Sequence, residues 1–237
     1  MSRIEYINAH HELCNVPLLV DKIIENKQAY LNLLASVDKF HHKIIFFDTA
    51  VKVKKLYYFS PTSWSGVVPN HFSDKYKSIR ELQSFPDRFA KNIRVIEMYR
   101  NTLIPLAKPV EVSNKIFIQR KSLSRMENEN EVAELLQKHD YQLVNLENYS
   151  IFEQVYIFNN ATKVVAEEGA GCVNLMYCKE KTNFLLITPS NWISYTFSSL
   201  AYSAGVTITY FLSSECNYND RKHVVNVKSL EELIKTY

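Results

Sequence analysis

The chain has 237 residues, of which 46% are hydrophobic and 22% are charged, and its formal net charge is only +3. This length suffices for one large or two small domains, and the composition excludes a disordered or fibrous protein. So weak a net charge does not indicate a nucleic-acid partner, although it leaves open peripheral association with an anionic membrane. No apolar run is long enough to span a bilayer, and the segment MSRIEYINAH lacks the hydrophobic stretch of a signal peptide.

The four cysteines form neither a C-x-x-C pair nor a zinc pattern with histidines; they are Cys14, Cys172, Cys178 and Cys216. This usage predicts buried free thiols and a cytoplasmic protein, with association at the inner face of the membrane left open.

In chain order, the N-terminal half predicts strands at 17–20, 43–49 and 51–60 and helices at 20–37, 77–85 and 92–104. A loop rich in Pro, Ser and Gly is expected at 60–72. The segment 105–113 contains two prolines and is the candidate linker between an N-terminal domain, 1–104, and a C-terminal domain, 105–237.

The C-terminal half predicts strands at 114–120, 141–147, 163–167, 183–190 and 206–212. Helices are expected between and after them, at 128–140, 150–161, 170–178, 191–205 and 229–237. Strands that alternate with helices in this way predict right-handed βαβ units and a parallel sheet covered on both faces. The fold class is therefore α/β.

Two of the four glycines, Gly169 and Gly171, stand two residues apart between a predicted strand and a predicted helix. Ligands of open parallel sheets bind beyond the carboxyl ends of the strands, where helix N-termini present free N–H groups. Glycine there lets a phosphate or ribose approach the backbone, and a tight turn with close strand–helix packing is the alternative explanation. The motif is neither a P-loop nor a dinucleotide fingerprint, because no Gly-Lys-Ser/Thr follows and position 174 is asparagine.

Arg120 ends the predicted strand at 114–120, and Arg125 follows just before a helix. Two guanidinium groups at one strand terminus suit bidentate binding of a diphosphate, and solvated surface arginines are the alternative. The acidic run ENENE after them is explained by negative charge in a first helical turn, with Asn128 as the cap.

Ser150 and Glu153 have the S-x-x-E spacing of a capping box at the start of a helix. Because this helix also follows a strand, its N-terminus is expected on the same edge of the sheet. Glu153 or Gln154 could then also face a ribose hydroxyl.

The segments RKSLSRMEN at 120–128, SIFEQ at 150–154 and GAGCVN at 169–174 occur together in that order. In order and spacing they resemble the glycosyltransferase family 61 domain, clearly over 105–180 and more loosely upstream. The resemblance implies an inverting transferase of GT-B architecture, with two Rossmann-like domains, mainly parallel sheets and a cleft between them. It also implies a nucleotide-sugar donor and a glycan acceptor.

The chain departs from the family pattern in two places. Many relatives have histidine immediately before the G-A-G, where this chain has Glu168, and the upstream N-x-x-H-W-like segment is missing. Either the N-terminal acceptor-side domain is reduced, or Met1 begins inside a longer gene product. The residues expected to bind substrate are Asn128, Ser150, Glu153, Gln154, Gly169, Ala170, Gly171 and Asn174, and those expected in catalysis are Arg120, Arg125, Glu168 and Asp48.

An inverting transfer needs a base for the acceptor hydroxyl and charge stabilisation for the departing nucleoside diphosphate. Metal-dependent transferases usually hold their ion with Asp-x-Asp, which this sequence lacks. The expectation is therefore a reaction without metal or cofactor, in which Arg120, Arg125 and the helix start after Gly169 stabilise the leaving group.

The base has several candidates. Asp48 ends a predicted strand, where an ordinary turn residue is the alternative, and Glu168 could instead contact a sugar or ribose hydroxyl. His10, His11 and His71 are further candidates from the first domain, with surface histidines as the alternative.

A competing class is a non-catalytic nucleotide- or glycan-binding domain that partners a larger synthase, which the missing N-x-x-H-W-like segment favours. Abundant Lys, Asn and Ile indicate an AT-rich bacterial genome, and hence capsule or lipopolysaccharide synthesis.

Overall fold

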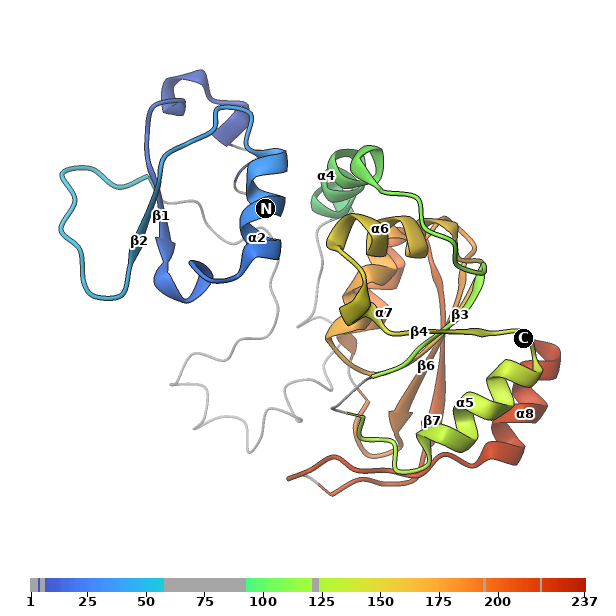
Figure 1. Ribbon diagram of the computed structural model, residues 1–237. Helices are drawn as coiled ribbons and strands as arrows, with labels where there is room; N and C mark the ends of the chain where they lie inside the picture. The colour runs from blue at the N-terminus through green and yellow to red at the C-terminus, as the bar shows by residue number, and fades with distance from the viewer. Residues whose placement is uncertain (1–3, 5–6, 58–92, 121–123, 194, 218) are drawn as a thin grey trace. The chain divides into compact units, whose positions relative to one another are not determined.

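The computed structural model describes the whole chain except residues 1–3, 5–6, 58–92, 121–123, 194 and 218 (Figure 1). The chain divides into two compact units, Met1–Thr62 and Ser63–Tyr237. Within the described ranges, no helix is both long and apolar enough to cross a membrane.

The first unit holds a two-stranded parallel sheet made of β1 (Leu18–Asp21) and β2 (Ile44–Phe47). Helix α2 (Gln28–Val37) connects the two strands and buries Leu33 and Val37. The strands at 17–20 and 43–49 are thus confirmed within a residue or two at each end.

Two predictions for this unit are wrong in part. The helix expected at 20–37 begins only at Gln28, because β1 continues to Asp21 and a short 3-10 turn, η2 (Lys22–Ile24), follows it. The Asp21 carboxylate caps this turn by accepting a hydrogen bond from the Ile23 amide at 2.9 Å. The described part of the strand expected at 51–60, residues 51–57, is not a strand. Its alternating pattern finds no partner, and Val51 and Leu56 are 48% and 64% exposed.

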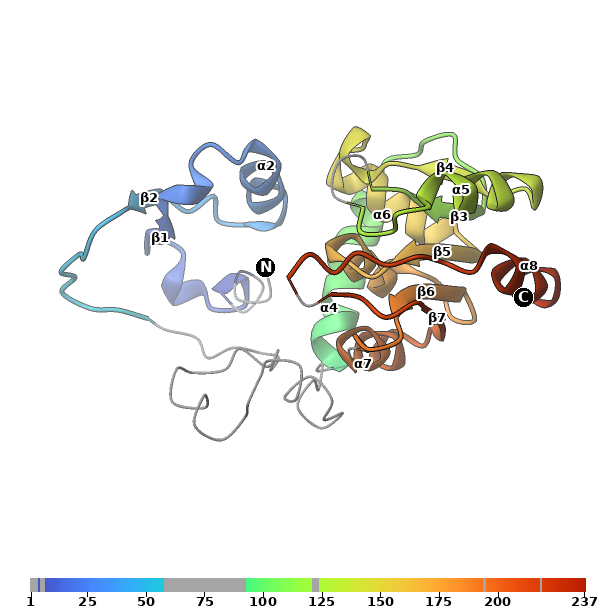
Figure 2. The same ribbon diagram turned by 90° about the horizontal axis from the view of Figure 1, so that it is seen from below.

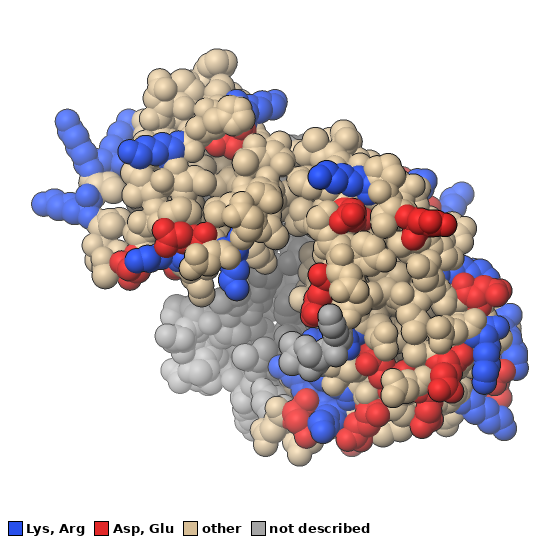
Figure 3. All heavy atoms as spheres, viewed as in Figure 1, with Lys and Arg blue, Asp and Glu red and all other residues tan. Residues whose placement is uncertain are grey.

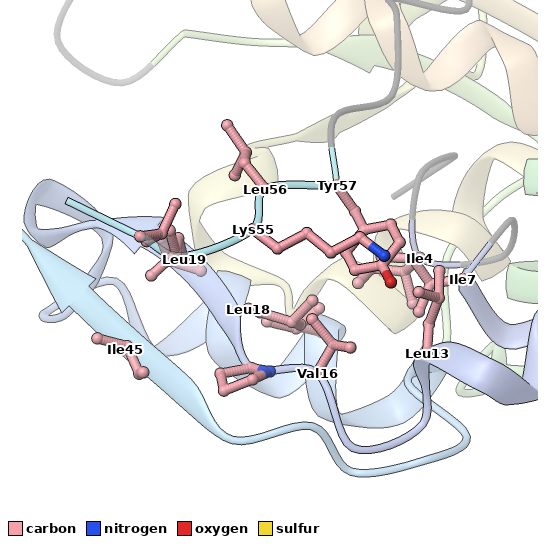
Figure 4. A pocket seen from close by; sticks show the side chains of 14 residues that line it. Ile4, Ile7, Leu13, Val16, Leu18, Leu19, Ile45, Lys55, Leu56 and Tyr57 are labelled. Carbon is pink, nitrogen blue, oxygen red and sulfur yellow. The ribbon is translucent and has the colours of Figure 1, made fainter. Parts of the chain in front are cut away.

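Residues from this segment and from β1 instead line an apolar cavity of about 520 Å³ within the first unit (Figure 4). Two of the residues that line this cavity contact each other: the Lys55 ammonium lies 4.6 Å from the centre of the Tyr57 ring. The loop predicted at 60–72 and the helix predicted at 77–85 lie outside the described residues.

The second unit is built on a five-stranded, wholly parallel sheet in the order β4-β3-β5-β6-β7. The strands are β3 (Lys115–Ile118), β4 (Gln142–Val144), β5 (Lys163–Glu167), β6 (Asn183–Pro189) and β7 (Thr207–Ser213). All five strands predicted in the C-terminal half are present. The three central strands, β3, β5 and β6, are buried along most of their length, as a sheet covered on both faces requires, whereas the edge strands β4 and β7 are largely half-buried or exposed.

Helices cover both faces of this sheet (Figures 1 and 2). They are α4 (Ile93–Leu103), α5 (Glu129–Lys138), α6 (Ile151–Asn160), α7 (Tyr195–Ala204) and α8 (Val227–Thr236). Helices α5 and α8 pack on one face over Phe117, Val165 and Leu185, while α4, α6 and α7 lie on the other.

Three short 3-10 segments complete the unit: η5 (Ile104–Leu106), η6 (Leu146–Asn148) and η7 (Ala170–Tyr177). The helix predicted at 170–178 is therefore a 3-10 helix and not an α-helix. Acidic and basic side chains are interspersed over the face of this unit drawn in Figure 3.

Helix α4 packs on α7, and the Arg100 Nη1 donates a hydrogen bond to the Ala204 carbonyl at 2.9 Å. The proline-containing segment 105–113, which suggested a boundary between domains 1–104 and 105–237, thus connects α4 to β3 inside one compact unit.

Candidate functional site

The strand order of the second unit creates a topological switch point. The chain runs from β3 outward to β4 and then returns past β3 to β5, so the connections after β3 and β5 leave in opposite directions. In open parallel sheets of this order the ligand crevice lies outside the carboxyl ends of those two strands. Arg120 follows β3 by two residues, and Glu167, Glu168 and Gly169 end and follow β5.

The guanidinium of Arg120 lies directly against Gly169. A Cβ atom at Gly169 would lie 3.0 Å from Arg120 Nη1 and 3.4 Å from its Cζ. The backbone of Gly169 is extended, with φ at 177°, a value that any residue adopts. The absence of a side chain at this glycine therefore makes room for the arginine, whereas the backbone angles would accept any residue.

Gly171 has a different environment. A Cβ atom there would lie 2.9 Å from Leu146 Cδ1 and 3.7 Å from Ile118 Cγ2. Its small size serves the packing of η7 against β3 and η6. Of the two explanations open for the glycine pair, close packing describes Gly171. At Gly169 the close neighbour is an arginine side chain, and approach of a phosphate or ribose to the backbone stays a prediction.

A buried carboxylate, that of Glu167, organises the loop that carries the two arginines. Its side chain is 2% exposed, and its Oε1 accepts hydrogen bonds from the Arg125 backbone amide at 3.0 Å and from His223 Nε2 at 3.2 Å. Its Oε2 accepts from the Ser124 hydroxyl at 3.4 Å and lies 3.8 Å from Arg120 Nη1. Glu167 thus fixes both ends of the Arg120–Arg125 loop.

The network continues away from the edge through His223. With Nε2–H donating to Glu167, its Nδ1 accepts from the hydroxyl of Ser213, which ends β7, at 2.7 Å. The backbone of His223 also pairs with Arg125 and Glu127, at 2.9 Å in both hydrogen bonds. These contacts hold the loop before α5 against the loop after β7.

Arg120 Nη1 is buried and has no hydrogen-bond partner among the described residues. The 3.8 Å separation from Glu167 is too long for a hydrogen bond. A buried charged donor left unsatisfied costs about 1–3 kcal/mol or more, which an anion bound at this place would recover.

Arg125 lies at the same edge, and within the described ranges no ion pair joins its guanidinium to a carboxylate. Burial lowers the pKa of Arg125, and the neighbouring positive charges of Arg221 and Arg120 lower it further. The charges of Glu167 and Glu168 oppose this effect, so three guanidinium groups lie near two carboxylates, and the excess of positive charge suits a bound anion.

Glu168 follows β5 and is partly buried. Its Oε2 accepts a hydrogen bond from the Thr188 hydroxyl at 2.7 Å. Burial raises the pKa of Glu168, against the opposing effects of the Thr188 hydrogen bond and of the charges on Arg125 and Arg221. A raised pKa brings a carboxylate closer to the range in which it exchanges protons near neutral pH.

A sequence model of one family, glycosyltransferase 61, matches residues 5–185, which is most of the chain. The chain belongs to the glycosyltransferase 61 family. Among curated proteins, the comparison found no match.

The family match contains Arg120, Arg125 and the glycine motif, and it ends before β7. Further residues of the site therefore lie beyond the matched range, among them Thr188, Ser213, Arg221 and His223. Sequence reasoning missed them, and it treated Glu167 only as the last residue of a strand. The one available signal was the pair Glu167–Glu168 at the carboxyl end of a buried strand.

The first helical turn after the arginines has a structural role in this glycosyltransferase. Glu129 Oε1 accepts from the Arg120 amide at 3.2 Å, and burial raises the pKa of Glu129. Asn128 occupies the N-cap position of α5, but its side chain makes no capping hydrogen bond. Its amide instead pairs with the backbone of Val225, at 2.9 Å in both directions, so the predicted cap is wrong.

The capping box of Ser150 and Glu153 is confirmed, with hydrogen bonds in both directions. Gln154 Nε2 donates to the carbonyls of Leu146 and Tyr149, and its Oε1 accepts from Asn174 Nδ2 at 3.1 Å. These polar groups hold η6, α6 and η7 together. Binding of a ribose by Glu153, Gln154, Asn174 or the neighbouring Ala170 stays a prediction.

Asp48 belongs to the first unit, where it follows β2. Its carboxylate is 58% exposed and forms an ion pair with Lys22 at 3.0 Å. His11 packs edge-on against Phe40, with ring centres 5.1 Å apart, while His71 lies outside the described residues.

No group of three or more His, Cys, Asp or Glu residues in the described part of the chain is arranged to hold a metal ion. The four cysteines are free, as predicted, but the prediction that they are buried is right for only two of them. Cys172 and Cys178 are buried, whereas Cys14 and Cys216 are partly exposed.

Proposed function

We propose that this chain is an inverting glycosyltransferase that moves a sugar from a nucleoside-diphosphate sugar to a glycan acceptor. The observation that carries the proposal is the Arg120 guanidinium, which lies against Gly169 at the switch point with its Nη1 buried and unsatisfied by the described residues. A diphosphate supplies the acceptor oxygens that such a donor lacks, and guanidinium groups bind phosphates in bidentate fashion.

In the proposed reaction the acceptor hydroxyl attacks the anomeric carbon of the donor sugar. Its oxygen forms the new glycosidic bond with inversion, and its proton passes to a carboxylate base. The bond from the anomeric carbon to the phosphate oxygen breaks, and its electron pair leaves with the nucleoside diphosphate. Arg120 and Arg125 stabilise the negative charge that develops on that leaving group.

Glu168 is the base we propose, because it follows β5 near Arg125 and Arg221 and because burial raises its pKa. Asp48 is the second candidate. The reaction is proposed to need no metal ion or cofactor, since two guanidinium groups can supply the charge for which other transferases use a cation.

A GT-B architecture, with two Rossmann-like domains around a cleft, belongs to the same proposal. So does a role in bacterial capsule or lipopolysaccharide synthesis at the cytoplasmic face of the membrane. Family membership supports the sugar-transfer chemistry, and the sequence composition supports the bacterial setting.

The proposal is tested first by thermal-shift screening against UDP-, GDP- and CMP-sugars. A pyrophosphate site predicts stabilisation by UDP- or GDP-sugars and little by CMP-sugars, which carry a single phosphate. Hydrolysis of the stabilising donor is then measured, with and without a chelator, for the wild type and two variants, Arg120→Ala and Arg125→Ala.

Each variant is expected to lose about 10²–10³ in rate, the usual effect of removing one donor to a developing oxyanion, while its melting temperature is kept. Lys138→Ala is the matched control, because it removes one exposed positive charge from α5 away from the switch point. Near-normal turnover in both arginine variants would contradict the assignment. Donor binding without any hydrolysis or transfer would favour the non-catalytic binding domain that partners a larger synthase.

A further inference from the structure

We infer that Arg221, held on the indole ring of Trp192, is a third guanidinium of the anion site and binds the donor diphosphate from the β6–β7 side. This inference rests on the proposed function and extends it to a residue beyond the range that the family match covers.

The position of Arg221 is fixed by stacking. Its Cζ lies 4.1 Å from the centre of the Trp192 ring, and Trp192 is only 7% exposed. Trp192 follows β6, and its carbonyl oxygen lies 2.8 Å from Thr188 Oγ1, whose single proton it shares with Glu168 Oε2. The same hydroxyl contacts Glu168, so the stacked pair and Glu168 share one support.

The loop that carries Arg221 is fastened to the rest of the unit at several points. Asn191 pairs with both backbone groups of Cys216, at 3.0 and 2.9 Å. Ser214 pairs with Val224 through its amide and its hydroxyl, at 3.0 and 2.9 Å. A loop secured in this way holds its side chains in fixed positions, as a binding site requires.

Arg221 has a positive φ of 56°, which a non-glycine residue seldom adopts. Unfavourable backbone angles of this kind persist where the surrounding structure enforces them and often occur at binding sites. Here the left-handed backbone turns the chain so that the side chain lies over Trp192.

The charge of Arg221 acts on the site already described. It is the nearby charge that lowers the pKa of Arg125 most, and it opposes the effect of burial on the pKa of Glu168. No ion pair joins Arg221 to a carboxylate within the described ranges, and stacking on an indole leaves the edge N–H groups of a guanidinium available. Arg120, Arg125 and Arg221 thus line the carboxyl edge of the sheet from β3 towards β7.

The test is calorimetric titration with inorganic pyrophosphate, orthophosphate and UDP, applied to the wild type and to Arg221→Ala, Arg221→Lys and Arg120→Ala. Lys222→Ala is the matched control, because it removes an exposed positive charge from the adjacent position of the same loop. Arg221→Ala is expected to weaken pyrophosphate and UDP binding about 10- to 100-fold, as loss of a charge-assisted hydrogen bond does. Arg221→Lys keeps the positive charge but loses the guanidinium group that lies over the indole. Its affinity for pyrophosphate and UDP is expected to lie between those of the wild type and Arg221→Ala.

Trp192→Leu separates stacking from charge, since it removes the support but keeps Arg221. It is expected to weaken pyrophosphate binding, and in a donor-hydrolysis assay to raise KM more than it lowers kcat. Its melting temperature is measured alongside, and only folded protein is titrated.

The outcomes separate the two proposals. If Arg120→Ala loses pyrophosphate binding while Arg221→Ala binds as tightly as Lys222→Ala, the role of Arg221 is overturned and the proposed function stands. If the wild type binds neither pyrophosphate nor UDP, both are overturned. Equal losses for orthophosphate and pyrophosphate in Arg221→Ala would also overturn the assignment to a diphosphate.

Discussion

A methyl group added at Gly169 would contact the side chain of Arg120, whereas one added at Gly171 would contact the apolar side chain of Leu146. At Gly169 the new atom would lie 3.0 Å from Arg120 Nη1, about 0.4 Å inside ordinary contact distance, so the guanidinium must shift by a few tenths of an ångström. At Gly171 it would lie 2.9 Å from Leu146 Cδ1, with Ile118 behind it. The two substitutions therefore predict opposite phenotypes.

Gly169→Ala is expected to lower donor turnover roughly tenfold, because misplacement by 1 Å costs about a hundredfold and this shift is smaller. Its stability should be unchanged or up to about 1 kcal/mol higher, since the extended backbone accepts alanine and the unfolded chain loses freedom. Gly171→Ala overfills a packed site and should lose about 1–2 kcal/mol, or roughly 2–8 °C in Tm. Its turnover per folded molecule should stay near that of the wild type.

The assay measures Tm and donor hydrolysis for both variants and repeats Gly169→Ala in an Arg120→Ala background. If the methyl group acts through the guanidinium, its effect on rate disappears once the guanidinium is gone. A tenfold loss that persists in the double variant, or a Tm loss in Gly169→Ala equal to that in Gly171→Ala, would refute the reasoning.

Two further predictions concern titratable groups. Burial raises the pKa of Glu168 above its ordinary 4.5, so the folded protein holds this proton more tightly and stability falls as pH rises from about 4.5 through the folded pKa. Glu168→Gln should remove that fall, as urea denaturation across the pH range would measure, and an unchanged slope would count against the burial of this carboxyl. Burial raises the pKa of Cys172 and of Cys178 to about 12, so Ellman's reagent at pH 8 should modify Cys14 and Cys216 first and all four only after unfolding. Rapid native modification of all four would contradict it.

The fold of the second unit was accessible from the sequence because its central strands, β3, β5 and β6, are apolar runs buried on both faces. A continuous apolar run such as that in β6 (Asn183–Pro189), of which six of seven residues are buried, is expected in the protein interior and not at the surface. The segment at 51–57 begins instead with an alternation of valine and lysine, and alternation predicts a strand only where a neighbouring strand is available to pair with it.

The candidate site was accessible in part for the same reason. Arg120 and Gly169 each follow a predicted parallel strand, and parallel strands deliver their carboxyl ends to one edge. The contact between Glu167 and His223 spans 56 positions in the chain, and no local pattern reports it.

The sequence by itself determined the order of the elements, the parallel sheet and the edge at which charged residues collect, because these depend on local apolar periodicity. Only the tertiary structure decided which polar groups are already satisfied. It pairs Asn128 with Val225, engages Gln154 with η6 and Asn174, and leaves Arg120 Nη1 without a hydrogen bond among the described residues. Hydrogen bonds and charge pairs depend on distances of a few ångströms between residues remote in the chain, and those distances are set when the helices pack on the sheet.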